Sequence, residues 1–174
     1  MKQFNLILAC DCNYGIGKNN KMPWPYNKKD MTQFRNKTIG NNNNCVIMGY
    51  NTYKSINEKP LSKRMNYVLT RKNTDNFIQE NNLEFVSSFE KIFLKINETN
   101  FDEYWIIGGG TIYNYFMENY LNLINEIHIT FLEHSYDCDV FFNHNETIKN
   151  NFILESSQKF DNTKFNIYKN IIKS

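Results

Sequence analysis

The sequence has no long hydrophobic run and no marked excess of charge of either sign. No stretch reaches the roughly 18 consecutive apolar residues that mark a membrane-spanning helix, and the apolar part of the opening MKQFNLILAC is too short for a signal peptide. The formal net charge is +2 at pH 7. A chain this close to neutral gives no reason to expect nucleic acid or a membrane as a partner, so we predict a cytoplasmic protein.

Cysteine and histidine are also scarce, and their spacing does not fit the common zinc patterns. The four cysteines are Cys10, Cys12, Cys45 and Cys138; no pair has C-x-x-C spacing, and the three histidines do not accompany them in a zinc-binding order. We therefore expect no metal site and predict free, mostly buried thiols in a reducing compartment.

Apolar and aromatic residues are plentiful enough for a packed interior. They make up 41% and 16% of the 174 residues, respectively. A chain of this length suits one domain with its own core. Because the sequence has no internal repeat and no long linker, we predict a single domain over residues 1–174.

Apolar runs bounded by turn-forming residues alternate with segments of helical periodicity. Strands are predicted over Phe4–Cys10, Cys45–Met48, Met65–Thr70, Leu83–Val86, Tyr104–Ile107, Glu126–Leu132, Phe152–Phe160 and Phe165–Ile172. Helices are predicted over Asn27–Lys37, Thr52–Ile56, Ser88–Ile96 and Thr111–Met117.

This alternation predicts an α/β fold with a mostly parallel central sheet and flanking helices. Single helices between strands act as crossovers, and they cover both faces of a parallel sheet. The last two strands are joined only by Asp161–Lys164, which fits a hairpin and predicts an antiparallel edge. In such a sheet a ligand binds at the carboxyl ends of the strands.

Two features of chemical interest follow the first predicted strand. In Gly15–Pro25 a glycine pair permits close approach to a flat ligand, and Met22-Pro23-Trp24-Pro25 forms a stiff apolar stretch with one indole donor. Asp30 then shares the inner face of the next helix with Phe34. Burying a carboxylate on this apolar face costs free energy unless a hydrogen-bond donor or a cation pairs with it. The alternative for the glycine pair is an ordinary loop without a ligand. The alternative for Asp30 is a surface acid or an acid in the first helical turn, where a negative charge is favourable in any case.

Two further features lie later in the chain. Trp105–Tyr113 is a buried strand that runs into three glycines and a helix, whose free N–H groups suit a pyrophosphate. The motif is not GxGxxG, and a plain strand–turn–helix corner is the alternative. Arg64 precedes a strand that ends at Thr70-Arg71-Lys72, and arginine suits a carboxylate or a phosphate. For each basic residue alone, a solvated surface position is the alternative.

Taken together, in order and with their spacing, these segments resemble dihydrofolate reductase from about Leu6 to Tyr168. The resemblance implies a monomer that reduces 7,8-dihydrofolate to tetrahydrofolate with NADPH and binds antifolate inhibitors. It implies an adenosine-binding subregion at roughly residues 44–100. With no thymidylate synthase segment in the sequence, we expect the chain to act alone or with a separate partner.

The resemblance also implies roles for residues around the substrate. Asp30 would bind the pterin, Thr130 would hydrogen-bond this carboxylate, and Trp24 would hold a water beside it; these three are the predicted catalytic set. Other implied substrate contacts are Ile7, Ala9, Phe34, Arg35, Ile56, Arg64 and Tyr113, with Arg64 on the α-carboxylate of the glutamate tail and Arg35 as a second contact.

A second implied set surrounds the cofactor. Its members are Ala9, Ile16, Gly17, Asn51, Thr52, Thr70, Arg71, Lys72, Gly109, Gly110, Thr111, Ile112 and Tyr113. Gly108-Gly109 would form the family's cis peptide. Asp139 would steady a mobile loop around Gly17–Met22.

The sequence departs from the family's pattern at four places. Tyr50-Asn51 replaces a basic pair, which leaves Thr70, Arg71 and Lys72 to hold the cofactor's 2′-phosphate. Tyr53 replaces a tryptophan. Lys63 replaces a glycine before Arg64, and Asn27 stands where an apolar residue usually contacts the substrate.

Three other functions compete with this interpretation. A riboflavin-pathway reductase would share the glycine-rich corner but would lack the pairing of Pro-Trp-Pro with Asp30. A non-catalytic folate-binding protein would have lost Asp30 or the glycines. An RNA-binding module would need a basic patch with exposed aromatics, which the net charge of +2 does not favour.

Overall fold

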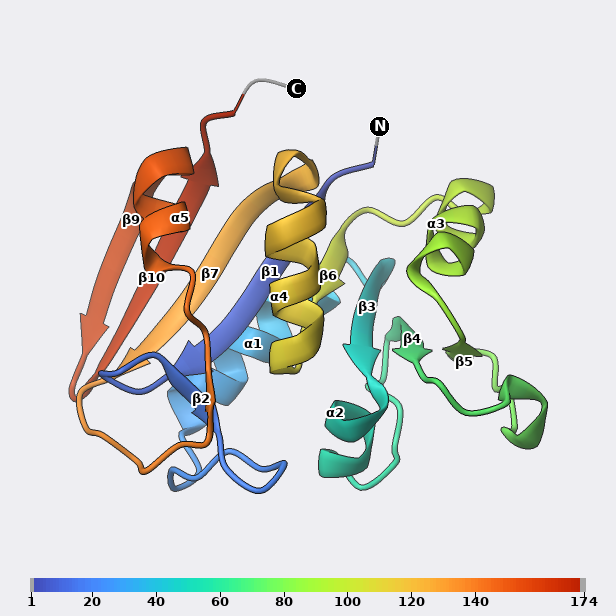
Figure 1. The fold of residues 1–174 in the computed structure, drawn as a ribbon, viewed down its shortest axis with the longest axis horizontal. Coiled ribbons are helices and arrows are strands. Elements are labelled where there is room, and N and C mark those ends of the chain that lie inside the picture. The colour runs from blue at the N-terminus through green and yellow to red at the C-terminus, as the bar shows by residue number, and fades with distance from the viewer. Residues whose placement is uncertain (1, 173–174) are drawn as a thin grey trace.

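A central eight-stranded sheet organises the protein (Figure 1), as seen in a computed structural model that describes residues 2–172. Its strands are β1 (Phe4–Cys10), β3 (Asn44–Gly49), β4 (Arg64–Leu69), β5 (Leu83–Val86), β6 (Tyr104–Ile106), β7 (Ile124–Leu132), β9 (Phe152–Phe160) and β10 (Thr163–Asn170). The helices are α1 (Lys28–Ile39), α2 (Tyr50–Ser55), α3 (Phe89–Glu98), α4 (Gly110–Asn119) and α5 (Asn145–Asn151).

The sheet is parallel except around β10. The strand order is β5-β4-β3-β6-β1-β7-β10-β9, and β10 runs antiparallel to both of its neighbours. A two-residue turn, Asp161-Asn162, joins β9 to β10. The predicted α/β architecture with an antiparallel edge is therefore confirmed.

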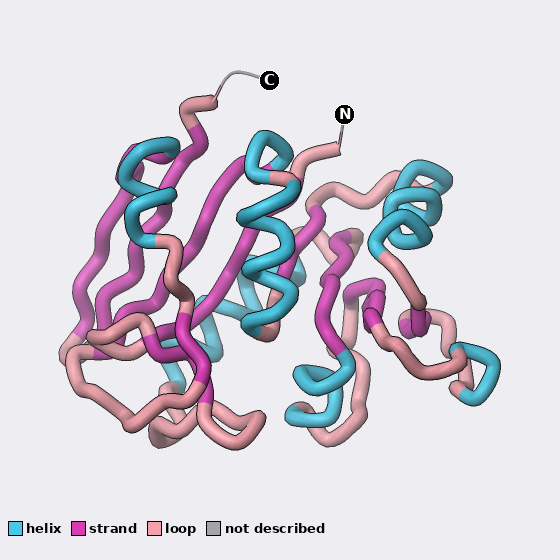
Figure 2. The backbone as a smooth tube through the Cα atoms, viewed as in Figure 1, coloured by secondary structure: helices cyan, strands magenta, loops and turns pink. Residues whose placement is uncertain are grey.

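Helices cover both faces of the sheet. In Figure 1, α4 and α5 cross the front of the sheet and α1 lies behind it, and the tube in Figure 2 shows the same layers. Strand β1 shows how the sequence serves both layers: Leu6 and Leu8 belong to one buried cluster with α3 and α4, whereas Ile7 belongs to a second cluster that Phe34 of α1 joins. Alternation of side chains along a strand produces this division.

Several elements escaped the sequence-based prediction. These are the short strands β2 (Gly15–Gly17) and β8 (Val140–Phe141), which pair with each other, helix α5, and two 3₁₀ turns at Thr74–Asn76 and Leu121–Leu123. Each is short and carries too few residues to show a period. β7 also begins at Ile124 rather than Glu126, and β10 is shifted to Thr163–Asn170 from the predicted Phe165–Ile172.

The cysteines are free, but the expectation that most are buried is only half met. Cys10 and Cys45 are buried, Cys138 is half-buried and Cys12 is exposed. No helix among residues 2–172 is long and apolar enough to cross a membrane.

Candidate active site

The first part of the site is a buried carboxylate at the start of α1. Asn27 caps this helix by accepting a hydrogen bond from the Asp30 backbone N–H at 3.1 Å. The Asp30 side chain points inward, and the residue is only 6% exposed. Burial raises the pKa of Asp30, and a hydrogen bond from the Thr130 hydroxyl of β7 offsets part of this effect. No lysine, arginine or histidine among residues 2–172 forms an ion pair with this carboxylate.

Tyr113 and an apolar wall complete this region. The Tyr113 hydroxyl of α4 donates to the Ile7 carbonyl at 2.7 Å. Burial and the nearby Asp30 charge both raise the pKa of Tyr113, which therefore keeps its proton. Ile7 belongs to a buried cluster against which Phe34 and Ile56 pack. Tyr113 thus lies near the Asp30 carboxylate and is hydrogen-bonded to Ile7 of the apolar cluster, to which β1, α1 and the turn after α2 contribute.

Arg64 forms a separate binding position at the start of β4. Its Nη1 donates to Thr38 Oγ1 at 2.6 Å and its Nε donates to the Ser62 carbonyl at 3.0 Å, so both contacts are to neutral groups. Burial and the neighbouring Arg35 lower the pKa of Arg64 to about 10. No carboxylate within the described part of the chain lies at ion-pair distance from Arg64. A buried guanidinium with neutral partners favours an incoming anion.

The glycine-rich corner lies where β6 meets α4. The Gly108–Gly109 peptide is cis, and Gly108 has φ of 101°. A Cβ atom at Gly108 would lie 2.9 Å from the Tyr113 hydroxyl, so a side chain there is excluded. Gly109 is the N-cap of α4, whose N-terminus no side chain of residues 2–172 caps. The N–H groups of Ile112 and Tyr113 donate to the Gly109 carbonyl, whereas those of Gly110 and Thr111 have no acceptor among residues 2–172 and are available to an anion.

Two neighbouring elements close around this corner. A Cβ at Gly49 would lie 3.2 Å from Ile112, and one at Gly109 would lie 3.2 Å from Thr52 Oγ1. A Cβ at Gly110 would meet Val140 of β8 at 2.6 Å. These close approaches bring the ends of β3, β6 and β8 together, and they place Thr52 beside the start of α4.

The loop after β1 is tied to the β7–β8 connection. Asp139 donates its backbone N–H to the Gly17 carbonyl at 2.9 Å and accepts from the Asn19 N–H through its carboxylate, also at 2.9 Å. Trp24 is 8% exposed, and its ring packs edge-on against Tyr136 with centroids 5.8 Å apart. The loop that carries the glycine pair and Trp24 is thus held from a distant part of the sequence.

Asp11 is a structural residue of this loop that sequence reasoning did not find. Its buried carboxylate accepts hydrogen bonds from the backbone N–H groups of Asn13, Gly15 and Tyr136 at 2.9, 2.8 and 3.0 Å. Burial raises the pKa of Asp11, but these donors outweigh it, so the pKa lies below its ordinary value. The only sequence signal was an acid placed directly after a buried strand.

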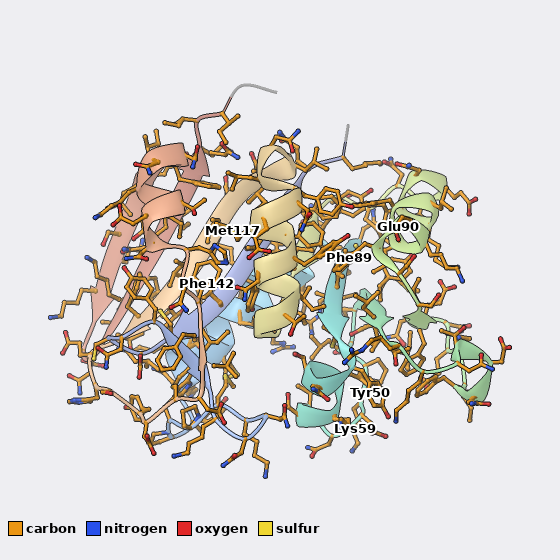
Figure 3. The ribbon with its side chains drawn as sticks, in the orientation of Figure 1. Tyr50, Lys59, Phe89, Glu90, Met117 and Phe142 are labelled. Atoms are coloured by element: carbon orange, nitrogen blue, oxygen red, sulfur yellow. The ribbon has the colours of Figure 1, made fainter. Side chains whose placement is uncertain are left out.

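Two lysine side chains lie over the aromatic ring of Tyr50, the first residue of α2. Lys72 Nζ lies 4.5 Å from the centre of the Tyr50 ring and Lys54 Nζ lies 5.5 Å from it. Tyr50 is labelled in Figure 3. Arg71 and Asn51 are exposed next to this group, whereas Thr70 is buried and its Oγ1 accepts from the Lys72 N–H at 3.1 Å. Sequence reasoning missed Lys54.

The remaining departures from the family pattern have visible consequences. Lys63 has φ of 61°, a left-handed conformation that suits glycine better than lysine. The Asn27 amide donates to Thr163 Oγ1 at 2.9 Å, so this residue links α1 to β10. The Tyr53 hydroxyl donates to the Glu58 carbonyl at 2.6 Å.

Fold and site together define an α/β enzyme whose ligands bind at the carboxyl ends of parallel strands. The sequence matches the dihydrofolate reductase family over residues 3–173. It is 32% identical over 168 residues to the dihydrofolate reductase of Ureaplasma parvum, covering 95% of this chain and 96% of the relative. It is 35% identical over 139 residues to that of Haemophilus influenzae (80% and 78% covered) and 30% identical over 153 residues to that of Gallus gallus (82% and 78%).

The chain therefore belongs to the dihydrofolate reductase family. It is an oxidoreductase that reduces dihydrofolate to tetrahydrofolate with a nicotinamide nucleotide. The identification made from the sequence motifs is confirmed. It replaces the three competing interpretations, which were a riboflavin-pathway reductase, a non-catalytic folate-binding protein and an RNA-binding module.

Proposed function

We propose that this enzyme uses NADPH and that Asp30 is the acidic group of its pterin site. The observation that carries the proposal is the buried Asp30 carboxylate, which has one neutral donor, Thr130, and no cationic partner among residues 2–172. Such a group favours a ligand that donates hydrogen bonds and becomes positively charged, as a pterin protonated at N5 does.

Each member of the proposed substrate site has its own task. Asp30 binds the 2-amino group and N3 of the pterin and stabilises the protonated ring, while Thr130 orients the carboxylate. Trp24 holds a water beside it. Ile7, Ala9, Phe34, Ile56 and Tyr113 line the rings and exclude bulk water, and Arg64, with Arg35 beside it, binds the glutamate tail.

The residues present fit a dinucleotide. The uncapped N-terminus of α4 offers backbone N–H groups to the pyrophosphate, and the glycines leave room for close approach. When bound, the reduced nicotinamide supplies the hydride. The residues that would hold the dinucleotide are Ala9, Ile16, Gly17, Asn51, Thr52, Thr70, Arg71, Lys72, Gly109, Gly110, Thr111, Ile112 and Tyr113.

The preference for NADPH over NADH rests on the cations near Tyr50. Lys72 and Lys54 both lie over this ring, and Arg71 is exposed beside them. These side chains supply positive charge for the 2′-phosphate in place of the basic pair that Tyr50-Asn51 replaces.

Several broader features belong to the same proposal. The chain forms one domain over residues 1–174, with an adenosine-binding subregion at roughly residues 44–100. It acts as a monomer in the cytoplasm and is inhibited by antifolates, since these carry a pterin-like ring that donates to a buried carboxylate.

A spectrophotometric assay tests the proposal. The purified enzyme should oxidise NADPH in the presence of dihydrofolate, with a higher kcat/KM than for NADH, and methotrexate should inhibit it. Equal efficiencies with the two cofactors would contradict the assignment of the cations near Tyr50.

A further inference from the structure

Helix α1, which carries Asp30, packs on the sheet without a deeply buried apolar side chain. Among residues 28–39 only Asp30 and Thr38 are buried, and both are polar. The apolar residues of this helix are half-buried: Met31, Phe34 and Ile39. Helix α4, by contrast, buries Ile112, Tyr113, Phe116 and Met117. Because helices in proteins are held mainly by their apolar faces, the exact position of α1 depends more than usual on polar contacts at its ends.

At the start of α1, the Asn27 side chain makes two hydrogen bonds. Its Oδ1 accepts from the Asp30 backbone N–H at 3.1 Å, and its Nδ2 donates to Thr163 Oγ1 at 2.9 Å. Since an N–H group can only donate, the amide oxygen faces Asp30 and the amide nitrogen is left to face Thr163. Thr163 is the first residue of β10 and is 5% exposed. Asn27 therefore ties the backbone of Asp30 itself to the β9–β10 hairpin.

The same hairpin also fixes the strand that carries Thr130. In the antiparallel pairing of β10 with β7, Phe165 lies opposite Thr130 and Thr163 lies opposite Leu132. The residue that bonds Asn27 thus stands two positions from the residue that faces Thr130, on one hydrogen-bonded stretch of strand. A shift of the start of α1 relative to β10 is therefore also a shift of Asp30 relative to Thr130.

The other contacts at this junction are weaker. Lys29 Nζ lies 2.7 Å from Asp161 Oδ2, but these side chains are 51% and 83% exposed, and an exposed ion pair contributes little. A cavity of about 350 Å³ lies here, and Trp24, Asn27 and Thr163 are among the residues that line it. Apolar packing therefore fills the junction incompletely, and the hydrogen bond between Asn27 and Thr163 is the contact on which the position of Asp30 most depends.

We propose that Asn27 and Thr163 are positioning residues of the reaction, because their hydrogen bond holds the first turn of α1 where Asp30 faces Thr130. This inference rests on the proposed role of Asp30 as the acid of the pterin site. Asn27 stands where the family usually has an apolar substrate contact, yet both polar atoms of its side chain bond protein groups. It therefore acts through Asp30, and this arrangement is a property of this chain.

The test measures hydride transfer in a single turnover with saturating dihydrofolate and NADPH, so that product release does not enter the rate. Thr163→Val keeps the branched shape but removes the acceptor, and the rate should fall about three- to ten-fold, as expected for one neutral hydrogen bond. Thr163→Ser keeps the hydroxyl and should stay within about two-fold of wild type.

Two variants at other positions complete the comparison. Asn27→Ser keeps a capping hydroxyl but is too short to reach Thr163, so its rate should match that of Thr163→Val. Thr99→Val is the matched control, because it removes an exposed hydroxyl that donates to the Lys95 carbonyl at the end of α3. Its rate should equal that of the wild type.

Double variants distinguish positioning from a general loss of stability. If the hydrogen bond acts through Asp30, adding Thr163→Val to Asp30→Asn should slow the reaction no further, and adding it to Asn27→Ser should likewise have no effect. The dissociation constant of NADPH, from fluorescence titration, should be the same in all these variants. An equal slowing by Thr163→Val in the Asp30→Asn background, or a Thr163→Val rate within about two-fold of wild type, would overturn the inference.

The single variants also keep this inference apart from the proposed function. An Asp30→Asn enzyme with more than about a tenth of wild-type activity would contradict the proposed function, and the inference with it. A strongly slowed Asp30→Asn enzyme, together with wild-type rates for Thr163→Val and Asn27→Ser, would contradict the inference alone. Should Thr163→Val fail to fold, Asn27→Ser provides the same comparison at a half-buried position.

Discussion

The Thr130 hydroxyl of β7 favours the charged form of the Asp30 carboxylate of α1, and it offsets part of the rise in the pKa of Asp30 that burial causes. The contact joins a strand on one side of the site to the helix behind the sheet, 100 positions apart in the sequence. One neutral donor does not compensate fully for burying a charge. The free enzyme therefore retains an incompletely satisfied acid where the pterin is proposed to bind.

Replacing Asp30 by asparagine should nearly abolish turnover. The Asp30→Asn side chain keeps the shape but loses the charge that stabilises a protonated pterin, so kcat at neutral pH should fall by about 100-fold or more. Cofactor affinity, measured by fluorescence titration, should change little. A variant that retains more than about a tenth of wild-type activity would rule out Asp30 as the central acid.

The same substitution should stabilise the free protein at neutral pH. The pKa of Asp30 is raised above its ordinary value of 3.8 in the folded protein. Stability from this group is therefore fully present below pH 3.8 and is lost as the pH rises through the folded pKa. Asp30→Asn should raise Tm at pH 7, by about 2–4 °C for each kcal/mol recovered, and the gain should disappear near pH 3.5. A Tm gain of equal size at both pH values would show that charge is not the cause.

Replacing Arg64 by leucine should damage recognition of the glutamate tail. Loss of a charge-assisted contact of about 1.5–3 kcal/mol should raise the KM for dihydrofolate about 10- to 150-fold. The Thr38 hydroxyl still donates to the Phe34 carbonyl at 2.8 Å, so it keeps a hydrogen bond in the variant. Dihydropterin without the tail is the control substrate; equal losses on both substrates would mean that Arg64 is only structural.

Replacing Arg71 by alanine should weaken discrimination between the two cofactors. The ratio of kcat/KM for NADPH to that for NADH should fall about ten-fold or more, because one charged contact to the 2′-phosphate is lost. Raising the salt concentration should weaken NADPH binding more than NADH binding. Lys91→Ala, which removes an exposed cation on α3, is the matched control. If Arg71→Ala leaves the ratio unchanged, Lys72 and Lys54 hold the phosphate, and Lys72→Ala should then change it.

Replacing Asp11 by asparagine should loosen the loop before Trp24. The carboxylate accepts three backbone hydrogen bonds and its pKa is lowered, so its stabilisation is present above pH 3.8 and is lost as the pH falls through the folded pKa. Urea unfolding at pH 7 should show a loss of about 1–3 kcal/mol, which shrinks in acid. Asp75→Asn, which removes an exposed acid, should show no such loss.

Local pattern was enough to predict most of the secondary structure and to single out several residues of the candidate site. The period-2 alternation around Ile7 and the helical spacing of Asp30 and Phe34 depend only on neighbours within one or two turns, and both are visible in the sequence. The glycine run at Gly108–Gly110 likewise predicted the turn between a strand and a helix. In these places local propensity and tertiary packing agree.

By itself, then, the sequence determined the parallel sheet, the carboxylate on α1 and the uncapped start of α4, because periodicity and glycine placement act over a few residues. Only the tertiary structure decided which residues far apart in the sequence come into contact. Tyr136 donates its N–H to Asp11 from 125 positions away, Lys54 and Lys72 converge on Tyr50, and Arg35 and Lys63 line one pocket. Such pairings depend on which strands lie side by side, and the order of strands in a sheet is not contained in the periodicity of any one of them.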